Sequence, residues 1–371
     1  MLVRRIAYSH GKIDTNKLFV MTYDDCYACN PQYIVDEIIR QQLPIDIVWV
    51  TSKKSKMDRF PPEVRTVKRR SFEMFEEQAT AKVWLDNALC CVWEGMPKKK
   101  GQVYINTWHG SLGIKKLSGN EVWMHRAKRC KRITDYCISN SRFEEDVYKT
   151  TFWPQTKMLR FGHARNDILF KSELHEHLRE RVCEFFEIPP EKKILLYAPT
   201  FRDDGNTDCF DINFDILKES LQMRFGGEWV ILLRLHHKNR RKKVFSQFND
   251  CIKDAGSYPD MQELLATVDI GITDYSSWAY DYILTKRPLF IYATDIDDYN
   301  DLRGFYYPLE ETPFPIATNN EELVRNILNF DNKTYLKDVE TFLEGKECME
   351  DGHASERVAK LIAQLIEMRV K

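Results

Sequence analysis

The segment Asp269-Ile270-Gly271-Ile272-Thr273-Asp274-Tyr275-Ser276-Ser277 contains the pattern that decides the fold. It begins as a short apolar run of the kind that forms a strand buried on both faces, and we expect this strand to end at Thr273. The hydroxyl of Ser276 or Ser277 can then cap a helix, whose free N–H groups and dipole would form an anion site. A strand that runs into a capped helix is the repeating unit of a parallel α/β sheet.

The same alternation of apolar runs and helical periods extends in both directions from this segment. Further strands are predicted at 17–23, 46–52, 82–87, 103–107, 136–139, 193–198, 229–235 and 287–293. Ser141, followed by Glu144, predicts a helix that begins at residue 142, and the amphipathic pattern of 354–371 predicts a terminal helix. We therefore predict an α/β fold with two Rossmann-like, doubly wound domains, residues 1–172 and 173–371, the second of which ends in the closing helix.

The composition is that of a globular protein, with 43% hydrophobic and 12% aromatic residues. No apolar run reaches the roughly 18–20 residues that cross a bilayer, and the N-terminus lacks the apolar segment of a signal peptide. We therefore expect a cytoplasmic protein whose ten Cys are free thiols. No G-x-G-x-x-G follows a strand and no G-x-x-x-x-G-K-S is present, so dinucleotide redox chemistry and P-loop hydrolysis have no support.

Polar side chains follow the predicted strands, at the edge where ligands bind in open α/β sheets. His109 follows one strand, and an imidazole is well suited to take a proton from a hydroxyl near neutral pH. Gly110 and Gly113 would let a ligand approach the backbone closely. Arg234 and His236 alternate along an extended segment, so both project to one face and could hold a phosphate.

Each of these residues also has a purely structural interpretation. His109 can be a core histidine, and Arg234 and His236 can belong to the solvated basic run that continues through 238–243. An ordinary helix cap would explain the serines after Thr273 equally well. The acidic residues at 203–204 and 295–298 can hold a divalent ion or simply form solvated loops.

Seven motifs of this chain resemble those of the CDP-glycerol glycerophosphotransferases of teichoic acid and capsule synthesis. They keep the family's order between about residues 13 and 357 and are His109-Gly110, Arg165-Asn166-Asp167, Tyr197-Ala198-Pro199-Thr200-Phe201-Arg202, Arg234-x-His236, Thr273-Asp274-Tyr275-Ser276-Ser277, Leu302-Arg303-Gly304-Phe305-Tyr306 and Asp351-Gly352-His353-Ala354-Ser355-Glu356-Arg357. The resemblance implies a GT-B fold. It also implies an enzyme that transfers glycerol phosphate or ribitol phosphate from CDP-glycerol or CDP-ribitol to a hydroxyl of a lipid-linked or polymeric acceptor, with release of CMP.

Carried over motif by motif, the resemblance assigns roles to individual residues. His109 is expected to act as the catalytic base, and Arg234 and His236 to hold the pyrophosphate and offset its developing charge. The residues expected to bind the CDP-alditol donor are Trp108, Gly110, Ser111, Leu112, Arg165, Pro199, Thr200, Arg234, His236, Ser276, Ser277 and Asp281. We expect that no cofactor is required, and the sequence does not support a requirement for a divalent cation.

Two departures from the family pattern concern the acceptor. Thr312-Pro313-Phe314-Pro315 stands where the pattern predicts Pro-Gly-Pro, which affects the local loop. The long N-terminal extension of the larger polymerases has no counterpart here, as is typical of a primase or a compact capsule enzyme.

Charge is unevenly distributed, although the net charge is −1: residues 1–172 carry +11 and residues 173–371 carry −12. We expect basic clusters to attract an anionic acceptor and the inner face of the cell membrane, and these clusters lie at 53–70, 98–100, 115–116 and 126–132. No nucleic-acid-binding pattern accompanies them, so nucleic acid is not expected as a partner. The main alternative is a GT-B glycosyltransferase or epimerase that uses a nucleotide sugar.

Overall fold

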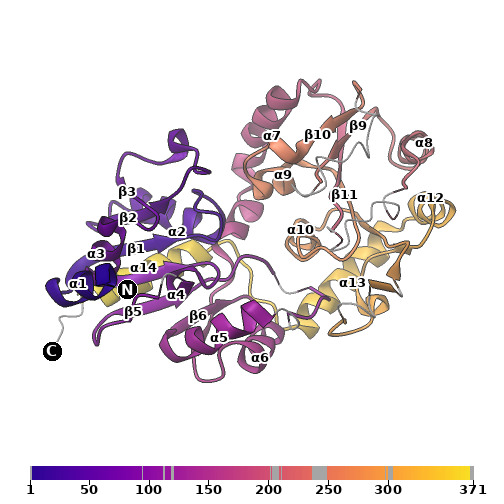
Figure 1. The fold of residues 1–371 in the computed structure, drawn as a ribbon. Coiled ribbons are helices and arrows are strands. Elements are labelled where there is room, and N and C mark those ends of the chain that lie inside the picture. The colour runs from indigo at the N-terminus through magenta and orange to yellow at the C-terminus, as the bar shows by residue number, and fades with distance from the viewer. Residues whose placement is uncertain are drawn as a thin grey trace. The chain divides into compact units, whose positions relative to one another are not determined.

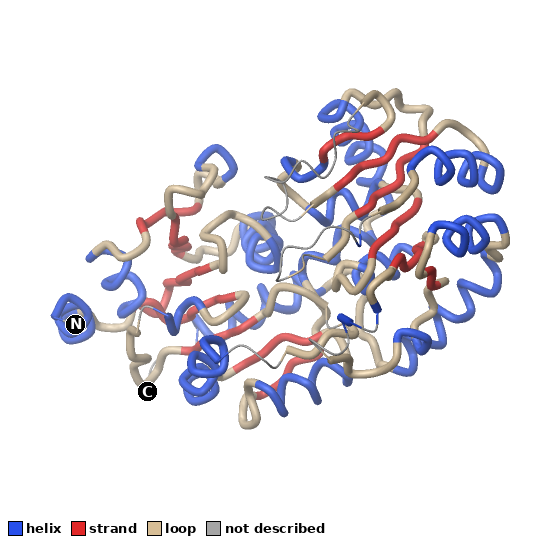
Figure 2. Tube along the Cα trace, turned by 45° about the vertical axis from the view of Figure 1, so that its right-hand side comes forward, coloured by secondary structure: helices blue, strands red, loops and turns tan. Residues whose placement is uncertain are grey.

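The computed structural model describes residues 2–367, except 94, 112, 118–120, 201, 203–208, 210, 236–248, 297 and 300–303. The chain divides into two compact units. Unit 1 comprises Met1–His109, Ser118–Asp167 and Glu347–Lys371, and unit 2 comprises Gly110–Leu117 and Ile168–Lys346. Each unit contains a parallel β-sheet flanked by helices (Figures 1 and 2).

The described part of unit 1 forms a seven-stranded sheet in the order β3-β2-β1-β4-β5-β6-β7. Its strands are β1 (Asp14–Met21), β2 (Asp46–Thr51), β3 (Val64–Lys68), β4 (Ala81–Asp86), β5 (Val103–Asn106), β6 (Tyr136–Ser139) and β7 (Lys157–Arg160). Its helices are α1 (Leu2–His10), α2 (Cys29–Arg40), α3 (Phe72–Thr80), α4 (Cys90–Trp93), α5 (Glu121–Ile133), α6 (Arg142–Thr151) and α14 (Ala354–Glu367). The central strand β4 is buried at every residue, because helices cover both of its faces.

The described part of unit 2 forms a six-stranded sheet in the order β10-β9-β8-β11-β12-β13. Its strands are β8 (Lys193–Tyr197), β9 (Trp229–Leu233), β10 (Ile252–Asp254), β11 (Ile270–Thr273), β12 (Leu289–Tyr292) and β13 (Ile316–Ala317). Its α-helices are α7 (Ser172–Phe186), α8 (Phe214–Phe225), α9 (Met261–Thr267), α10 (Ala279–Tyr282), α12 (Asn320–Leu328) and α13 (Asn332–Gly345). Short 3₁₀ turns include η2 (Ala164–Phe170), which begins in unit 1, and η4 (Ala255–Ser257).

Both sheets have the doubly wound strand order, in which the chain moves outward from the centre in one direction and then in the other. The direction reverses between β1 and β4 in unit 1, and between β8 and β11 in unit 2. Ligands of such sheets bind at this switch point, beyond the carboxyl ends of the strands. The predicted class, two Rossmann-like α/β domains, is therefore confirmed.

The strands that the sequence did not predict are the four at the sheet edges, namely β3 and β7 in unit 1 and β10 and β13 in unit 2. An edge strand has a single neighbour and exposes more of its side chains than a central strand, so it lacks a continuous apolar run. The three longer ones, VRTVK, KMLR and IKD, show this, because each contains exposed positions and none has two consecutive buried residues.

The terminal helix α14 belongs to unit 1, whereas the sequence placed it at the end of the second domain. Its buried residues Val358, Ala359 and Ile362 lie in one apolar cluster with Leu18 of β1 and Ile34 of α2. The Asp167 carboxylate also accepts hydrogen bonds from the backbone N–H groups of Ala354 and Ser355. An amphipathic pattern specifies an apolar face but not the sheet that covers it, which explains the difference.

We predict that Ile362→Ala destabilises unit 1 by about 2–5 kcal/mol, because it leaves a cavity under α14. Gln364→Ala, at an exposed position of the same helix, should change the free energy of unfolding by less than about 0.5 kcal/mol. Urea unfolding of both variants measures the difference. Equal stability of the two variants would contradict this packing.

Candidate active site residues

His109 lies just beyond the carboxyl end of β5 and is the last residue of unit 1 before the chain enters unit 2. Its Nδ1 is 2.8 Å from the backbone carbonyl oxygen of Asn87, which follows β4. A carbonyl oxygen can only accept, so Nδ1 carries the hydrogen and Nε2 of the neutral ring carries the lone pair. Desolvation and, to a smaller extent, the positive charge of Arg165 together lower the pKa of His109 to about 4, against the opposing effect of the Asn87 hydrogen bond. The ring is therefore neutral at pH 7.

The loop that carries His109 is fixed by side-chain amides. The Asn30 amide nitrogen donates to the carbonyl oxygens of Thr107 (3.0 Å) and Trp108 (3.3 Å). The Asn30 side-chain oxygen accepts from the backbone N–H of Arg165 at 3.1 Å. The Asn106 side-chain oxygen accepts from the N–H of Trp108 at 2.9 Å. Asn30 thus joins the loop before His109 to the loop that contains Arg165. From the sequence, Asn30 is expected only to cap a helix that begins near residue 31, whereas α2 begins at Cys29 and Ala28 is its N-cap residue.

Trp108 has a φ of 53°, in the left-handed region that residues other than glycine rarely adopt. Its indole is 5% exposed and packs against Tyr148, Phe152 and Trp153. Such a backbone conformation costs about 1–3 kcal/mol and persists where surrounding contacts hold it. We therefore infer that packing of the Trp108 ring fixes the turn that precedes His109.

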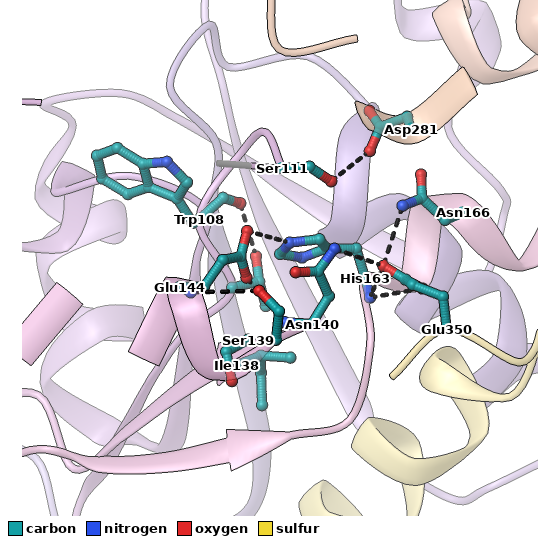
Figure 3. Close-up of polar contacts among 12 residues, drawn as sticks. Trp108, Ser111, Ile138, Ser139, Asn140, Glu144, His163, Asn166, Asp281 and Glu350 are labelled. Carbon is teal, nitrogen blue, oxygen red and sulfur yellow. Dashed lines mark hydrogen bonds and ion pairs between the residues drawn. The ribbon is translucent and has the colours of Figure 1, made fainter. Parts of the chain in front are cut away.

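A buried cluster of charged side chains lies around His163, in the loop between β7 and η2 (Figure 3). His163 Nε2 is 3.0 Å from Glu144 Oε1, and both side chains are at most 1% exposed. The Glu350 carboxylate accepts from the His163 backbone N–H and from the side-chain amides of Asn140 and Asn166. Sequence analysis identified Glu144 only through its cap position, and the cap is confirmed, since Ser141 accepts from the Glu144 N–H.

In unit 2, the segment after His109 is held by hydrogen bonds and close packing. Ser111 Oγ donates to Asp281 Oδ1 at 2.6 Å, and both residues are buried. A Cβ at Gly113 would lie 2.2 Å from the Tyr280 ring, and one at Gly110 would lie 3.1 Å from Ser277 Oγ. The close approach that we expected at these two glycines is therefore made by protein side chains of unit 2.

The switch point of unit 2 lies between β8 and β11 and is followed by Thr200 and Asp274. Asp274 accepts from the Thr200 backbone N–H at 2.8 Å and from Arg202 Nη1 at 2.8 Å. Arg202 also forms a bidentate ion pair with Asp295, in which Nε and Nη2 donate to the two carboxylate oxygens at 2.6 and 2.9 Å. This pairing lowers the pKa of the Asp295 carboxyl. The Thr200 hydroxyl oxygen is buried without a hydrogen-bond partner among the described residues, at the edge where Pro199 and Thr200 are expected to bind the donor.

The predicted helix cap after β11 is wrong. Helix α10 spans only Ala279–Tyr282, and Trp278 occupies its N-cap position without a side-chain cap. So short a helix provides no N-terminal anion site, because its few peptide dipoles sum to little. Ser276 and Ser277 instead accept backbone hydrogen bonds from Ala279 and Tyr280 in a turn, and both serines are partly exposed.

Arg234, just beyond β9, donates through Nη1 to the carbonyl oxygens of Ala255 (2.6 Å) and Tyr258 (2.9 Å). This contact ties the ends of β9 and β10 together at the carboxyl edge of the sheet. His236 and Leu112 lie outside the described residues, as do 203–204 and the basic run 238–243. Asp295 pairs with Arg202, and the described residues contain no cluster of three potential metal ligands.

Comparison with known proteins assigns the chain to a family. The model of the CDP-glycerol:poly(glycerophosphate) glycerophosphotransferases matches residues 3–364. The chain belongs to this family. The resemblance seen in the sequence motifs is thereby confirmed.

Relatives of the chain act in teichoic acid synthesis. A teichoic acid poly(glycerol phosphate) polymerase of Bacillus spizizenii is 30% identical over 90% of this chain and 88% of that protein. A teichoic acid glycerol-phosphate transferase of Staphylococcus aureus is 29% identical over 91% of this chain and 90% of that protein. The chain spans about half the length of another relative, a polymerase of Staphylococcus epidermidis, of which it covers 48%.

Solved structures agree with the family. The structure of the wall teichoic acid polymerase TagF aligns with this chain with a TM-score of 0.84 and 27% sequence identity. The alignment covers 100% of this chain and 94% of the TagF chain. A TagF variant soaked with CDPG has a TM-score of 0.82 and 28% identity, covering 98% and 93%. A putative UDP-N-acetylglucosamine 2-epimerase from Listeria monocytogenes shares only the fold, with a TM-score of 0.53 and 12% identity, covering 95% and 98%. The expected GT-B fold is confirmed.

We predict that His109 titrates with a pKa of about 4, so that it stays neutral from about pH 5 upward. Because its folded-state pKa lies below the ordinary value near 6.5, its contribution to stability is lost as the pH falls from 6.5 through 4. NMR titration of ¹⁵N-labelled histidine measures the pKa, and His109→Asn assigns the resonance. A pKa near 6.5 would contradict the described environment.

Proposed function

We propose that the protein transfers glycerol phosphate or ribitol phosphate from CDP-glycerol or CDP-ribitol to an acceptor hydroxyl. The observation that carries this proposal is the hydrogen bond from His109 Nδ1–H to the Asn87 carbonyl, in a chain that belongs to the glycerophosphotransferase family. The bond leaves the Nε2 lone pair to act as a base. Teichoic acid synthesis is the process named for the relatives, and we extend it to this chain as part of the proposal.

In the proposed reaction, the oxygen of the acceptor hydroxyl attacks the β-phosphorus of the donor. At the same time, Nε2 of His109 takes the proton of that hydroxyl. The new P–O bond forms while the bond from this phosphorus to the bridging oxygen breaks, and CMP leaves with that oxygen. The proton then passes from His109 to solvent. A pKa of about 4 describes the protein without substrate, and the negative pyrophosphate of a bound donor would raise it toward neutrality.

We propose that the donor binds to unit 2 at the carboxyl edge of its sheet, with Pro199, Thr200, Ser276 and Ser277 among its contacts. These residues follow the two strands that flank the switch point, and the Thr200 hydroxyl makes no hydrogen bond to the residues that the structure describes. Arg234 follows the next strand, β9, and is proposed to offset charge on the pyrophosphate. Arg202 has a different role, because both of its carboxylate partners belong to the loops that it braces.

CMP release tests the proposal directly. Purified protein is offered CDP-glycerol and CDP-ribitol with a panel of synthetic lipid-linked acceptors, and CMP and product mass are followed. We expect acceptor-dependent CMP release with at least one CDP-alditol. Release of a nucleoside diphosphate from a nucleotide sugar would instead support the glycosyltransferase alternative.

His109→Ala should lower kcat by about 10²–10⁴-fold and leave the Kd of the donor nearly unchanged, as expected when a general base is removed. Trp84→Phe, which removes an indole N–H bonded to the Gln78 carbonyl away from the site, serves as the structural control. Near-normal turnover in His109→Ala would overturn the assignment of the base.

We propose further that exposed cations of unit 1 attract an anionic acceptor and the inner face of the membrane. Unit 1 as observed carries 31 Lys+Arg and 24 Asp+Glu, so its net charge is +7. Lys53, Lys54 and Lys56 are exposed beyond β2, and Arg70 is exposed beyond β3, at the carboxyl edge that also carries His109. Lys98 differs, because it pairs with Asp135. No helix among the described residues is long and apolar enough to span a bilayer.

The charge reversal Lys53→Glu/Lys54→Glu should weaken binding to anionic vesicles by at least about 30-fold, since each cation near the surface contributes about 1 kcal/mol. Vesicle sedimentation at low and high salt measures the binding, which should weaken as salt rises. Lys333→Glu/Lys337→Glu, on an exposed face of α13, is the matched control in unit 2. Salt-independent binding, or an equal effect of both double variants, would contradict the role of this surface.

A further inference from the structure

The His163 cluster is a buried charged group that the proposed reaction does not use. Glu144 comes from the first turn of α6, Glu350 from the segment before α14, and Arg165 from η2. Figure 3 shows Glu144 and Glu350 on opposite sides of His163. Burying ionisable groups is costly unless they are paired and hydrogen-bonded, and here both carboxylates have such partners.

Burial and neighbouring charges have opposing effects on the side chains of the cluster. Burial opposes the charged form of His163, but Glu144 outweighs it and raises the pKa of the imidazole, while Arg165 acts in the opposite direction. Burial raises the pKa of Glu350 to about 7. His163 Nδ1 is buried without a hydrogen-bond partner among the described residues, so the ring is held from its Nε2 side by Glu144.

A continuous chain of hydrogen bonds leads from this cluster to the His109 loop. Glu350 binds the backbone N–H of His163 and the side chain of Asn166, which fixes the loop around Arg165. The Arg165 N–H then donates to Asn30, and Asn30 donates to the carbonyl oxygens of the two residues before His109. Every bond in this chain lies within unit 1.

The cluster also joins two places where the chain passes between units. The chain leaves unit 1 after Asp167 and returns at Glu347. Asn166 binds Glu350, and Asp167 binds the first residues of α14, so both crossings are fastened to each other inside unit 1. The Arg165 loop is thereby attached to the segment at the start of α14 and, through Asn30, to the His109 loop.

We propose that His163, Glu144 and Glu350 are positioning residues for the reaction, which hold the Arg165 loop and, through Asn30, the imidazole of His109. This inference rests on the proposed role of His109 as the base. None of the three side chains needs to touch substrate in this role. A displacement of about 1 Å in a catalytic group is enough to lower turnover by about 100-fold.

The test compares Glu144→Gln and His163→Gln with the wild type. We expect kcat to fall by about 10–100-fold. KM for CDP-glycerol should change by a smaller factor, because only Trp108 and Arg165 of the expected donor ligands lie in unit 1. Glu77→Gln is the matched control, since Glu77 is a largely buried glutamate of unit 1 that pairs with Lys17 at 2.7 Å and Arg65 at 2.8 Å. It should lower the thermal midpoint while keeping kcat.

A double-mutant cycle tests the path through Asn30. If the cluster acts through this side chain, Asn30→Ala should lower kcat, and adding His163→Gln should lower it by less than about twofold more. Independent, multiplicative losses would overturn the path. Wild-type kcat in both Glu144→Gln and His163→Gln would overturn the whole proposal. Glu350→Gln, which is nearly isosteric, gives the same test if either variant fails to fold.

A readout that needs no turnover separates this inference from the proposed function. The NMR titration of His109 should show its pKa move from about 4 toward 6.5 in His163→Gln, because a loosened loop admits water to the ring. An unchanged His109 titration contradicts the positioning role. If the wild type releases no CMP but the His109 pKa still shifts in His163→Gln, the proposed function is contradicted and the positioning role is not.

Discussion

The parallel direction of the strands is the constraint on which the rest of the structure depends. In both units all paired strands run the same way, so their carboxyl ends meet at one edge of each sheet. Residues that are distant in sequence, such as Asn30, Asn87 and His109, therefore come together at this edge of the sheet. The order of the strands then decides which of these ends are neighbours.

Side-chain amides perform most of the positioning at this edge of unit 1. Beyond the last strand residue the backbone groups lose their sheet partners and need others. Asn30, Asn106 and Asn166 supply these hydrogen bonds without adding charge near the imidazole. The positive charge of Arg165 helps to keep His109 neutral. Unit 2 solves the same problem with charges, where Arg202 and its two carboxylate partners brace the loops after β8, β11 and β12.

An element was predicted correctly where residues close to it in the sequence are enough to specify it. Central strands such as β6 were found at their predicted positions because burial on both faces leaves an apolar run. Ser141 caps α6 as predicted, since a cap needs only its own helix turn. The residues after β11 include serines as well, but these lead into a turn and the short α10, in which Trp278 occupies the N-cap position. Edge strands escaped prediction because a strand with a single neighbour exposes more of its side chains and so lacks a continuous apolar run.

By itself the sequence determined the α/β class, the central strands, the family motifs and His109 as the candidate base, because apolar periodicity and residue chemistry are local properties. Only the tertiary structure decided that α14 closes unit 1, that 110–117 belongs to unit 2, and that the Asn87 carbonyl sets the His109 tautomer. It also brought together His163, Glu144 and Glu350. These features depend on contacts between elements up to about 340 positions apart in the sequence, such as β1 and α14, and pairings of that kind are set by packing and by the burial of polar groups.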